Sequence, residues 1–156
     1  MSINQEVELL RNIPLFAKIE PSKLKLLAFT SERLTYQADQ VLCRQGDTGD
    51  AAYIIVEGEA AVRIATPNGD IEVARLGRGD VVGEIAILCD VPRTATVTAT
   101  QRVTTLKITK ELFFRLVNEF PQIAIEIMRE LAARLERTNA QLRDAVSRVP
   151  PQRRTE

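Results

Sequence analysis

Histidine is absent from this chain of 156 residues, and cysteine occurs only twice, at Cys43 and Cys89. Without an imidazole, the chain cannot form the Ser–His or Cys–His pairs that activate nucleophilic side chains. A metal-dependent enzyme built on a β-roll also needs histidine ligands, and the two cysteines are not a close pair that could replace them. No cluster of carboxylates points to acid–base chemistry either. We therefore expect a binding protein with no metal, rather than an enzyme.

Other missing features bear on location and partners. The 21 basic and 21 acidic residues cancel, so no global field attracts nucleic acid or an anionic membrane. No apolar run approaches the roughly 20 residues that span a bilayer, and residues 1–6 lack the basic region and apolar core of a signal peptide. Two cysteines are too few for a disulfide framework and are best explained as small apolar residues. These absences predict a cytoplasmic chain without a membrane segment or a nucleic-acid partner.

The length of the chain and its 45% content of hydrophobic residues allow a sizeable core, so we expect one compact domain. Residues 2–30 carry helical patterns, opened by a capping box of Ser2 and Gln5 and later by Pro21. Residues 31–108 are short β-rich runs between turn signals. Six to eight strands at this spacing suggest a double-sheet jelly roll, although the strand patterns alone leave sandwich and barrel undecided.

One turn signal within this region is specific. Asn68-Gly69 lies between two alternating runs, residues 62–64 and 71–73, and is preceded by Pro67. This arrangement predicts a β-hairpin, because both residues of the pair readily adopt the backbone conformations of a tight turn.

Residues 109–149 return to a helical period. We expect one helix from Lys110 to Glu119 and a second from Pro121, a position where proline is tolerated. The second helix carries an apolar seam in alternating steps of four and three residues: Ala124, Met128, Leu131, Leu135, Thr138, Leu142, Ala145 and Val149. Such a seam pairs two copies in a coiled coil or packs a single helix onto its own domain. Residues 150–156 are expected to form a disordered tail.

The most informative segment runs from Gly83 to Val97. An acidic residue directly follows a glycine, a small apolar helical turn comes next, and a single arginine, Arg93, lies in an uncharged stretch. A guanidinium in such a setting needs an anion, because an unpaired buried charge is costly. The glycine lets backbone N–H groups approach that anion, and the short turn adds its positive end. Glu84 can accept a hydrogen bond from a ribose 2′-OH, so the segment predicts a site for a sugar phosphate.

This segment resembles the phosphate-binding cassette of the cyclic nucleotide-binding domain family. The family's pattern is Gly-Glu-[Leu/Ile]-Ala-Leu, a short variable stretch, and Pro-Arg-[Ser/Thr/Ala]-Ala-[Thr/Ser]-Val. The resemblance extends upstream to Gly46-Asp47, residues 53–59 and residues 76–80, and covers roughly Leu9 to Leu135. It implies an α+β fold, with an eight-stranded antiparallel β jelly roll flanked by N-terminal helices and two C-terminal helices.

The family's site roles carry over residue by residue. Arg93 is expected to pair with the exocyclic phosphate oxygens and Glu84 to accept the ribose 2′-OH. Thr94 can donate to the phosphate or to a guanine, or can be a strand residue with no ligand role. The other expected contacts are Gly83 and the backbone N–H groups of Ile85, Ala86 and Ala95 beside the phosphate. Val62, Val73 and Val82 are candidates to flank the base, and the sequence does not fix which of them do.

Two positions depart from the family pattern. The residue before Gly83 is often aromatic in the family and is Val82 here, and Asp90 follows the cassette's short turn where a small residue is common. Neither is an expected contact of the phosphate or the ribose. The departures bear on the base pocket and the loop shape, and leave the predicted anion site unchanged.

The resemblance implies a regulatory receptor for a cyclic nucleotide, cAMP or cGMP, in which the ligand repositions the C-terminal helices. Regulators of the catabolite-activator type continue into a helix-turn-helix module, which has no counterpart after residue 149. We therefore expect the output to lie in a partner chain, a homodimer through residues 121–149, or a parent protein. The alternative is a dimerisation or scaffolding module with a vestigial pocket. Glu84 and Arg93 together favour the receptor, because an unused pocket has no reason to keep two buried opposite charges.

Overall fold

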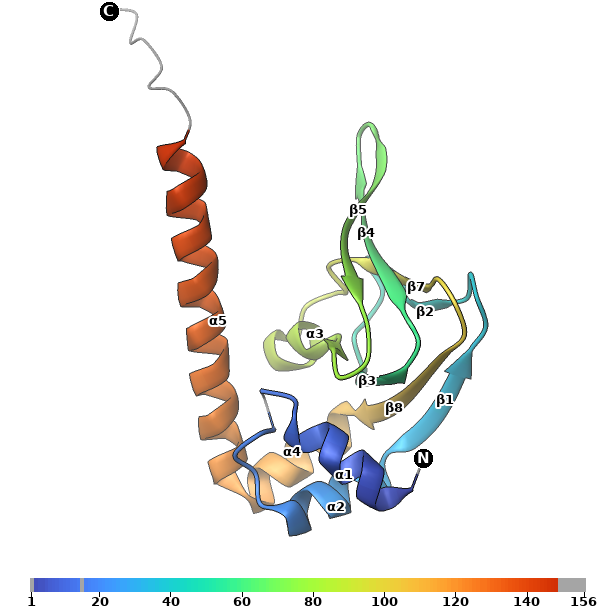
Figure 1. Cartoon of the computed structure of the whole chain (residues 1–156), viewed down its shortest axis with the longest axis vertical. Coiled ribbons are helices and arrows are strands. Elements are labelled where there is room, and N and C mark those ends of the chain that lie inside the picture. The colour runs from blue at the N-terminus through green and yellow to red at the C-terminus, as the bar shows by residue number, and fades with distance from the viewer. Residues whose placement is uncertain (1, 15, 149–156) are drawn as a thin grey trace, which may run out of the picture.

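Eight short strands form two four-stranded antiparallel sheets in the computed structural model, which describes residues 2–14 and 16–148 apart from the side chains of Glu84, Ile85 and Leu88 (Figure 1). One sheet has the strand order β1-β8-β3-β6 and the other β2-β7-β4-β5. The strands are β1 (Glu32–Tyr36), β2 (Val41–Cys43), β3 (Ala51–Glu57), β4 (Ala60–Thr66), β5 (Gly69–Leu76), β6 (Val81–Val82), β7 (Thr96–Ala99) and β8 (Val103–Thr109). The predicted eight-stranded jelly roll is confirmed.

Helices precede, interrupt and follow the roll. They are α1 (Ile3–Arg11), α2 (Pro21–Thr30), α3 (Glu84–Cys89), α4 (Lys110–Glu119) and α5 (Pro121–Ser147). Figure 1 shows α1, α2 and α4 grouped at one end of the roll, while α5 rises from that end and stands apart from the strands. The expected tail at residues 150–156 lies outside the described residues.

Side-chain caps fix the helix starts that the sequence indicates. The Ser2 hydroxyl accepts from the backbone N–H of Gln5 at 3.2 Å, and the Gln5 side chain accepts from the backbone N–H of Ser2 at 2.8 Å, which completes the predicted capping box. Thr109 caps α4 by accepting from the N–H of Leu112 at 3.1 Å. Pro121 occupies the first turn of α5, where its missing N–H costs no helical hydrogen bond.

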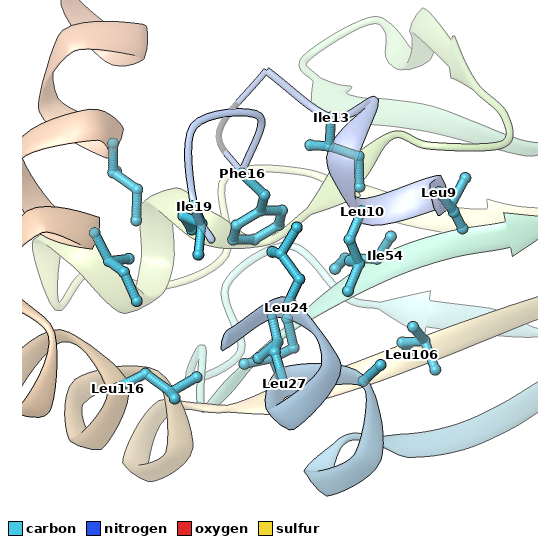
Figure 2. Close-up of a cluster of buried hydrophobic side chains, with 14 of the residues drawn as sticks. Leu9, Leu10, Ile13, Phe16, Ile19, Leu24, Leu27, Ile54, Leu106 and Leu116 are labelled. Carbon is cyan, nitrogen blue, oxygen red and sulfur yellow. The ribbon is translucent and has the colours of Figure 1, made fainter. Parts of the chain in front are cut away.

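Both faces of β3 are covered, which explains why six consecutive residues of this strand are buried. Ile54 and Val56 belong to a core that includes Leu24 of α2 and residues of α1, α4 and α5 (Figure 2). Tyr53 and Ile55 belong to a second core inside the roll, since successive strand residues face opposite sides. β3 is therefore the wall between the helical layer and the roll interior.

A buried ion pair connects α1 to the roll. Glu6 of α1 is fully buried and pairs with Arg33 of β1, whose side chain is half exposed. Neither carboxylate oxygen of Glu6 accepts a hydrogen bond of normal geometry from the described residues. Within the described structure, the guanidinium of Arg33 is thus the positive charge that balances the buried carboxylate of Glu6. Because a lone buried charge is strongly destabilising, the pair holds the N-terminal helices on the sheet.

The predicted hairpin joins β4, which ends at Thr66, to β5, which begins at Gly69. The pairing of these strands shifts by one residue: Val62 pairs with Ala74, and the next residue of β4 pairs two positions earlier on β5. Val73 is left without a cross-strand partner at this β-bulge and is 48% exposed.

Only the first turns of α5 dock on the domain. Ile127 is its last buried residue in the described chain, and Leu131 is partly buried against the same core. Farther along, Met128, Leu135 and Leu142 recur every seven residues and are 59%, 61% and 62% exposed. These three seam positions therefore form an exposed apolar stripe along α5 in the described residues, while Leu131 of the same seam packs on the core. The last predicted position of the seam, Val149, lies outside the described residues.

Candidate functional site

The loop between β2 and β3 holds the backbone of Arg93 on both sides. The N–H of Arg93 donates to the carbonyl oxygen of Asp47 at 2.8 Å, and its own carbonyl oxygen accepts from the N–H of Gly46 at 2.9 Å. This pair of bonds joins two segments nearly fifty residues apart in the sequence. These bonds give the Gly46-Asp47 motif a structural role, because the backbone of this loop holds the backbone of Arg93 in place.

The side chain of Arg93 is 7% exposed and is held by backbone carbonyls. Its Nη1 donates to the carbonyl oxygen of Gly83 at 3.1 Å, and its Nη2 donates to that of Ala51 at 2.5 Å. No described carboxylate forms an ion pair with it. The ring centroid of Tyr53 lies 6.0 Å from its Cζ. Among the described residues this buried guanidinium has only neutral oxygens as hydrogen-bond acceptors, and a buried cation without an ion-pair partner attracts an anion.

Two glycines make room for this arrangement. A Cβ added at Gly83 would lie 1.9 Å from Nη1 of Arg93, and the residue has a φ of +87°, which favours glycine. A Cβ added at Gly49 would lie 2.2 Å from the Cβ of Ala86 in α3. The β2–β3 loop therefore packs directly onto α3, and Arg93 lies against the carbonyl of Gly83, the residue just before this helix.

A cavity of about 130 Å³ extends from Arg93 into the roll. Arg93, Gly83 and Thr94 form its polar end. The rest is almost entirely apolar: Cys43, Val62, Leu76, Val81, Val82, Ala86, Ala95 and Val97. An anion site at one end of an apolar pocket matches a ligand with a charged group and a flat, weakly polar body.

Most of the predicted site residues lie at this cavity. Gly83, Ala86, Arg93, Thr94, Ala95, Val62 and Val82 line it together. Val73 is not among the lining residues: it lies in β5, whose residues 69–75 are all exposed, so the structure does not bring it to the expected base position. The side chains of Glu84 and Ile85 lie outside the described part of the structure, although their backbone forms the start of α3.

Several contributors were missed in the sequence. Ala51 and Gly49 support Arg93 and α3, and Leu76 and Val81 line the cavity. The Gly-Asp pair occurs twice within residues 46–50. This repeat could have indicated Gly49, since a second glycine in one loop suggests a second place where the backbone packs closely against a neighbouring segment. Nothing in the sequence marks Ala51, because it acts through its backbone carbonyl.

Of the two cysteines, Cys43 is buried as a small apolar residue and Cys89 is not. Cys43 is 7% exposed, and burial raises the pKa of its thiol, with Arg93 only partly opposing this effect. It therefore remains protonated at neutral pH. Cys89 is exposed at the end of α3. No three His, Cys, Asp or Glu side chains among the described residues are grouped to hold a metal ion, and none of the described helices is long and apolar enough to cross a membrane.

Fold and site together define a jelly-roll domain with a buried cation beside an apolar cavity. The profile of the cyclic nucleotide-binding domain family matches residues 33–120. A cyclic nucleotide-gated potassium channel from Mesorhizobium japonicum is 38% identical over 133 residues, which are 85% of this chain and 35% of the channel. A cAMP-dependent protein kinase regulatory subunit from Blastocladiella emersonii is 36% identical over 115 residues, which are 73% of this chain and 28% of the subunit.

A solved structure agrees with these relatives. The N-terminal domain of a transcriptional regulator from Streptomyces coelicolor superposes with a TM-score of 0.74 at 31% identity, covering 85% of this chain and 95% of that chain. The chain belongs to the cyclic nucleotide-binding domain family. It spans about a third of the length of the two curated relatives above.

The described residues fit the ligand that the family name implies. Arg93 is a buried cation without an ion-pair partner among the described side chains, and a Cβ at Gly83 would fill the space that its guanidinium occupies. Both observations suit a phosphate held at this point. The apolar remainder of the cavity suits a nucleobase.

Proposed function

We propose that this chain is a receptor domain for a cyclic nucleotide, with cAMP preferred and cGMP as the competing ligand. The observation that carries the proposal is Arg93, a buried guanidinium held on two carbonyl oxygens at the polar end of an apolar cavity. In this proposal Arg93 pairs with the cyclic phosphate. Val62 and Val82 contact the base, and Thr94 donates to the phosphate or to a guanine. The kinase regulatory subunit from Blastocladiella emersonii, described as cAMP-dependent, supports cAMP as the first ligand to test.

In the same proposal Glu84 accepts the ribose 2′-OH. Glu84 directly follows Gly83, and the carbonyl oxygen of Gly83 accepts a hydrogen bond from Arg93. The proposed ribose contact, Glu84, is therefore next in the chain to the residue that holds the proposed phosphate contact, Arg93. The backbone N–H groups of Ile85, Ala86 and Ala95 complete the contacts around the phosphate. A linear nucleotide, or a cyclic nucleotide that lacks the 2′-OH, can make only some of these phosphate and ribose contacts.

The ribose contact predicts a specific pattern of losses. Glu84→Gln is expected to weaken cAMP binding, and 2′-deoxy-cAMP is expected to bind the wild type poorly but to lose little more in the variant. The reason is that both changes remove the same hydrogen bond, so their effects are not additive. Isothermal titration calorimetry gives the four dissociation constants. The matched control is Glu57→Gln, which removes the same charge from the exposed end of β3. Fully additive losses would assign Glu84 a role away from the ribose.

We further propose that the ligand acts through α5. This helix follows the roll directly, docks only by its first turns, and carries an exposed stripe of Met128, Leu135 and Leu142. A ligand shifts such an equilibrium only if it binds one arrangement of the helix better than the other. The two arrangements we propose are α5 free and α5 engaged, either over the base or with a second copy of the chain. The stripe favours the second copy, because its seven-residue spacing is that of a coiled-coil seam.

Saturating cAMP is accordingly expected to slow amide hydrogen exchange between Glu126 and Leu142. The physical reason is that engagement of the stripe reduces local opening of a helix that otherwise has little buried surface. Exchange mass spectrometry checks the segment, with the amides of α1 as an internal control expected to stay unchanged. Analytical ultracentrifugation separates docking within one chain from dimerisation. Identical exchange in the segment with and without ligand would leave a passive binding module.

A further inference from the structure

The guanidinium of Arg93 has two fixed contacts on one edge. Nη1 and Nη2 each donate to a carbonyl oxygen, from Gly83 and Ala51. Two bonds on the terminal nitrogens fix the position of that edge, and the third corner of the group, Nε, is held only by the flexible stem of the side chain, so the plane can still tilt by rotation within that stem. A phosphate needs the plane in one orientation, because paired N–H donors bind oxygens well only when aligned with them. A further neighbour beside the group would oppose this tilt.

Tyr53 is this neighbour, since Cζ of Arg93 lies over its ring. Its ring centroid lies 6.0 Å from Cζ of Arg93, within the range of a cation–π interaction. The ring belongs to the core inside the roll and is 8% exposed. Its own orientation is fixed by Tyr36, against which it packs edge to face at 6.5 Å and 83°. Tyr36 of β1 thus packs against Tyr53 of β3, and Tyr53 in turn lies beside Arg93.

The cavities show on which side of Arg93 this support lies. Arg93 and Cys43 line both the 130 Å³ cavity inside the roll and a second, open hollow of about 690 Å³. Tyr53 and Tyr36 line the hollow and not the inner cavity. Tyr53 therefore borders the open hollow beside Arg93, while its cross-strand partner Val82 lines the inner cavity. Without the ring, the guanidinium gains room to turn outward into the hollow.

The hydroxyl groups of the two tyrosines do not supply the contact. Burial raises the pKa of Tyr36 to about 12, and burial also raises the pKa of Tyr53, with Arg93 only partly opposing it. Both phenols are protonated at neutral pH, so no phenolate forms an ion pair with Arg93. The contact is made by the aromatic ring alone, and phenylalanine at position 53 preserves it.

We propose that Tyr53 is a positioning residue that fixes the plane of the Arg93 guanidinium for an anionic ligand. The part of this inference that concerns cAMP rests on the proposed function. In calorimetry with cAMP, Tyr53→Leu is expected to raise the dissociation constant about tenfold, as for loss of a largely desolvated cation–π contact, while Tyr53→Phe stays within about threefold. In the Arg93→Ala background, Tyr53→Leu is expected to cause little further loss, because its effect acts through the arginine. A tenfold loss that persists in that background would overturn the inference, as would equal affinities of Tyr53→Leu and wild type.

A second measurement needs no ligand. The side-chain Nε–Hε signal of Arg93 in a nitrogen-15 spectrum is assigned by its absence in Arg93→Lys. We expect the same position and slow water exchange in wild type and Tyr53→Phe, and a shifted, faster-exchanging signal in Tyr53→Leu. If the leucine variant fails to fold, Tyr53→Met replaces it, since methionine fills irregular space without a ring. An unchanged signal in the ringless variant would overturn the inference. A changed signal in a chain that binds no cyclic nucleotide would support the positioning role and refute the proposed function.

Discussion

Arg93→Ala is expected to lose about 3 kcal/mol of binding free energy for cAMP, a change of more than about 100-fold in the dissociation constant. The loss is large because the guanidinium is buried at 7% exposure and is the cation at the polar end of the cavity. Its removal leaves the phosphate in a desolvated place without a charge partner. Isothermal titration calorimetry measures the effect directly.

Two further variants show whether this loss is specific. Arg93→Lys retains the charge but cannot donate in parallel to Gly83, Ala51 and a phosphate, so we expect an intermediate loss. Arg102→Ala removes the same charge from an exposed position and is expected to leave binding unchanged. An Arg93→Ala variant that binds cAMP within twofold of wild type would refute the assignment of the phosphate site.

Arg33→Ala is expected to lower the free energy of unfolding by about 3 kcal/mol, because it leaves the fully buried carboxylate of Glu6 without its compensating charge. The double variant Glu6→Leu/Arg33→Ala is expected to recover most of this loss, since an apolar side chain at position 6 has no charge to compensate. Urea unfolding followed by circular dichroism gives the free energies.

The exposed pair of Arg11 and Glu8 is the matched control on the same helix. These side chains form a 2.9 Å ion pair and are more than half exposed. Arg11→Ala is expected to leave the free energy of unfolding almost unchanged, because exposed pairs of this kind contribute little. Equal losses for Arg33→Ala and Arg11→Ala would mean that burial of Glu6 is not what makes its pair important.

The sequence predicts the parts of this protein that depend on local pattern. The cassette motif, with fixed spacing over fifteen residues, led to Arg93, and the uncharged stretch around it predicted the burial that the structure has. The capping box at Ser2 and the helix from Lys110 to Glu119 follow from short-range rules of helix capping. The two-sheet roll follows from strand spacing and the family resemblance.

The contacts that the sequence did not reveal join residues distant along the chain. Gly49 meets Ala86, and Glu6 meets Arg33, only after the sheets and helices have packed. Val73 lies at a one-residue bulge of the exposed strand β5, and the sequence alone does not fix which apolar strand residues flank the cavity. Bulges carry no reliable signal in a single sequence. The support of Arg93 by Tyr53 depends equally on a distance between two strands and a loop.

The most direct test of the central claim is a calorimetric titration of the wild-type chain with cAMP, cGMP and linear 5′-AMP. The proposed site recognises a cyclic phosphate on Arg93 with a ribose 2′-OH beside it. We therefore predict saturable binding of one cAMP per chain, with 5′-AMP weaker by about 100-fold, equivalent to about 2.7 kcal/mol. cGMP is expected to bind the same site more weakly than cAMP. Equal affinity for cAMP and 5′-AMP, or no binding of either cyclic nucleotide, would contradict the account.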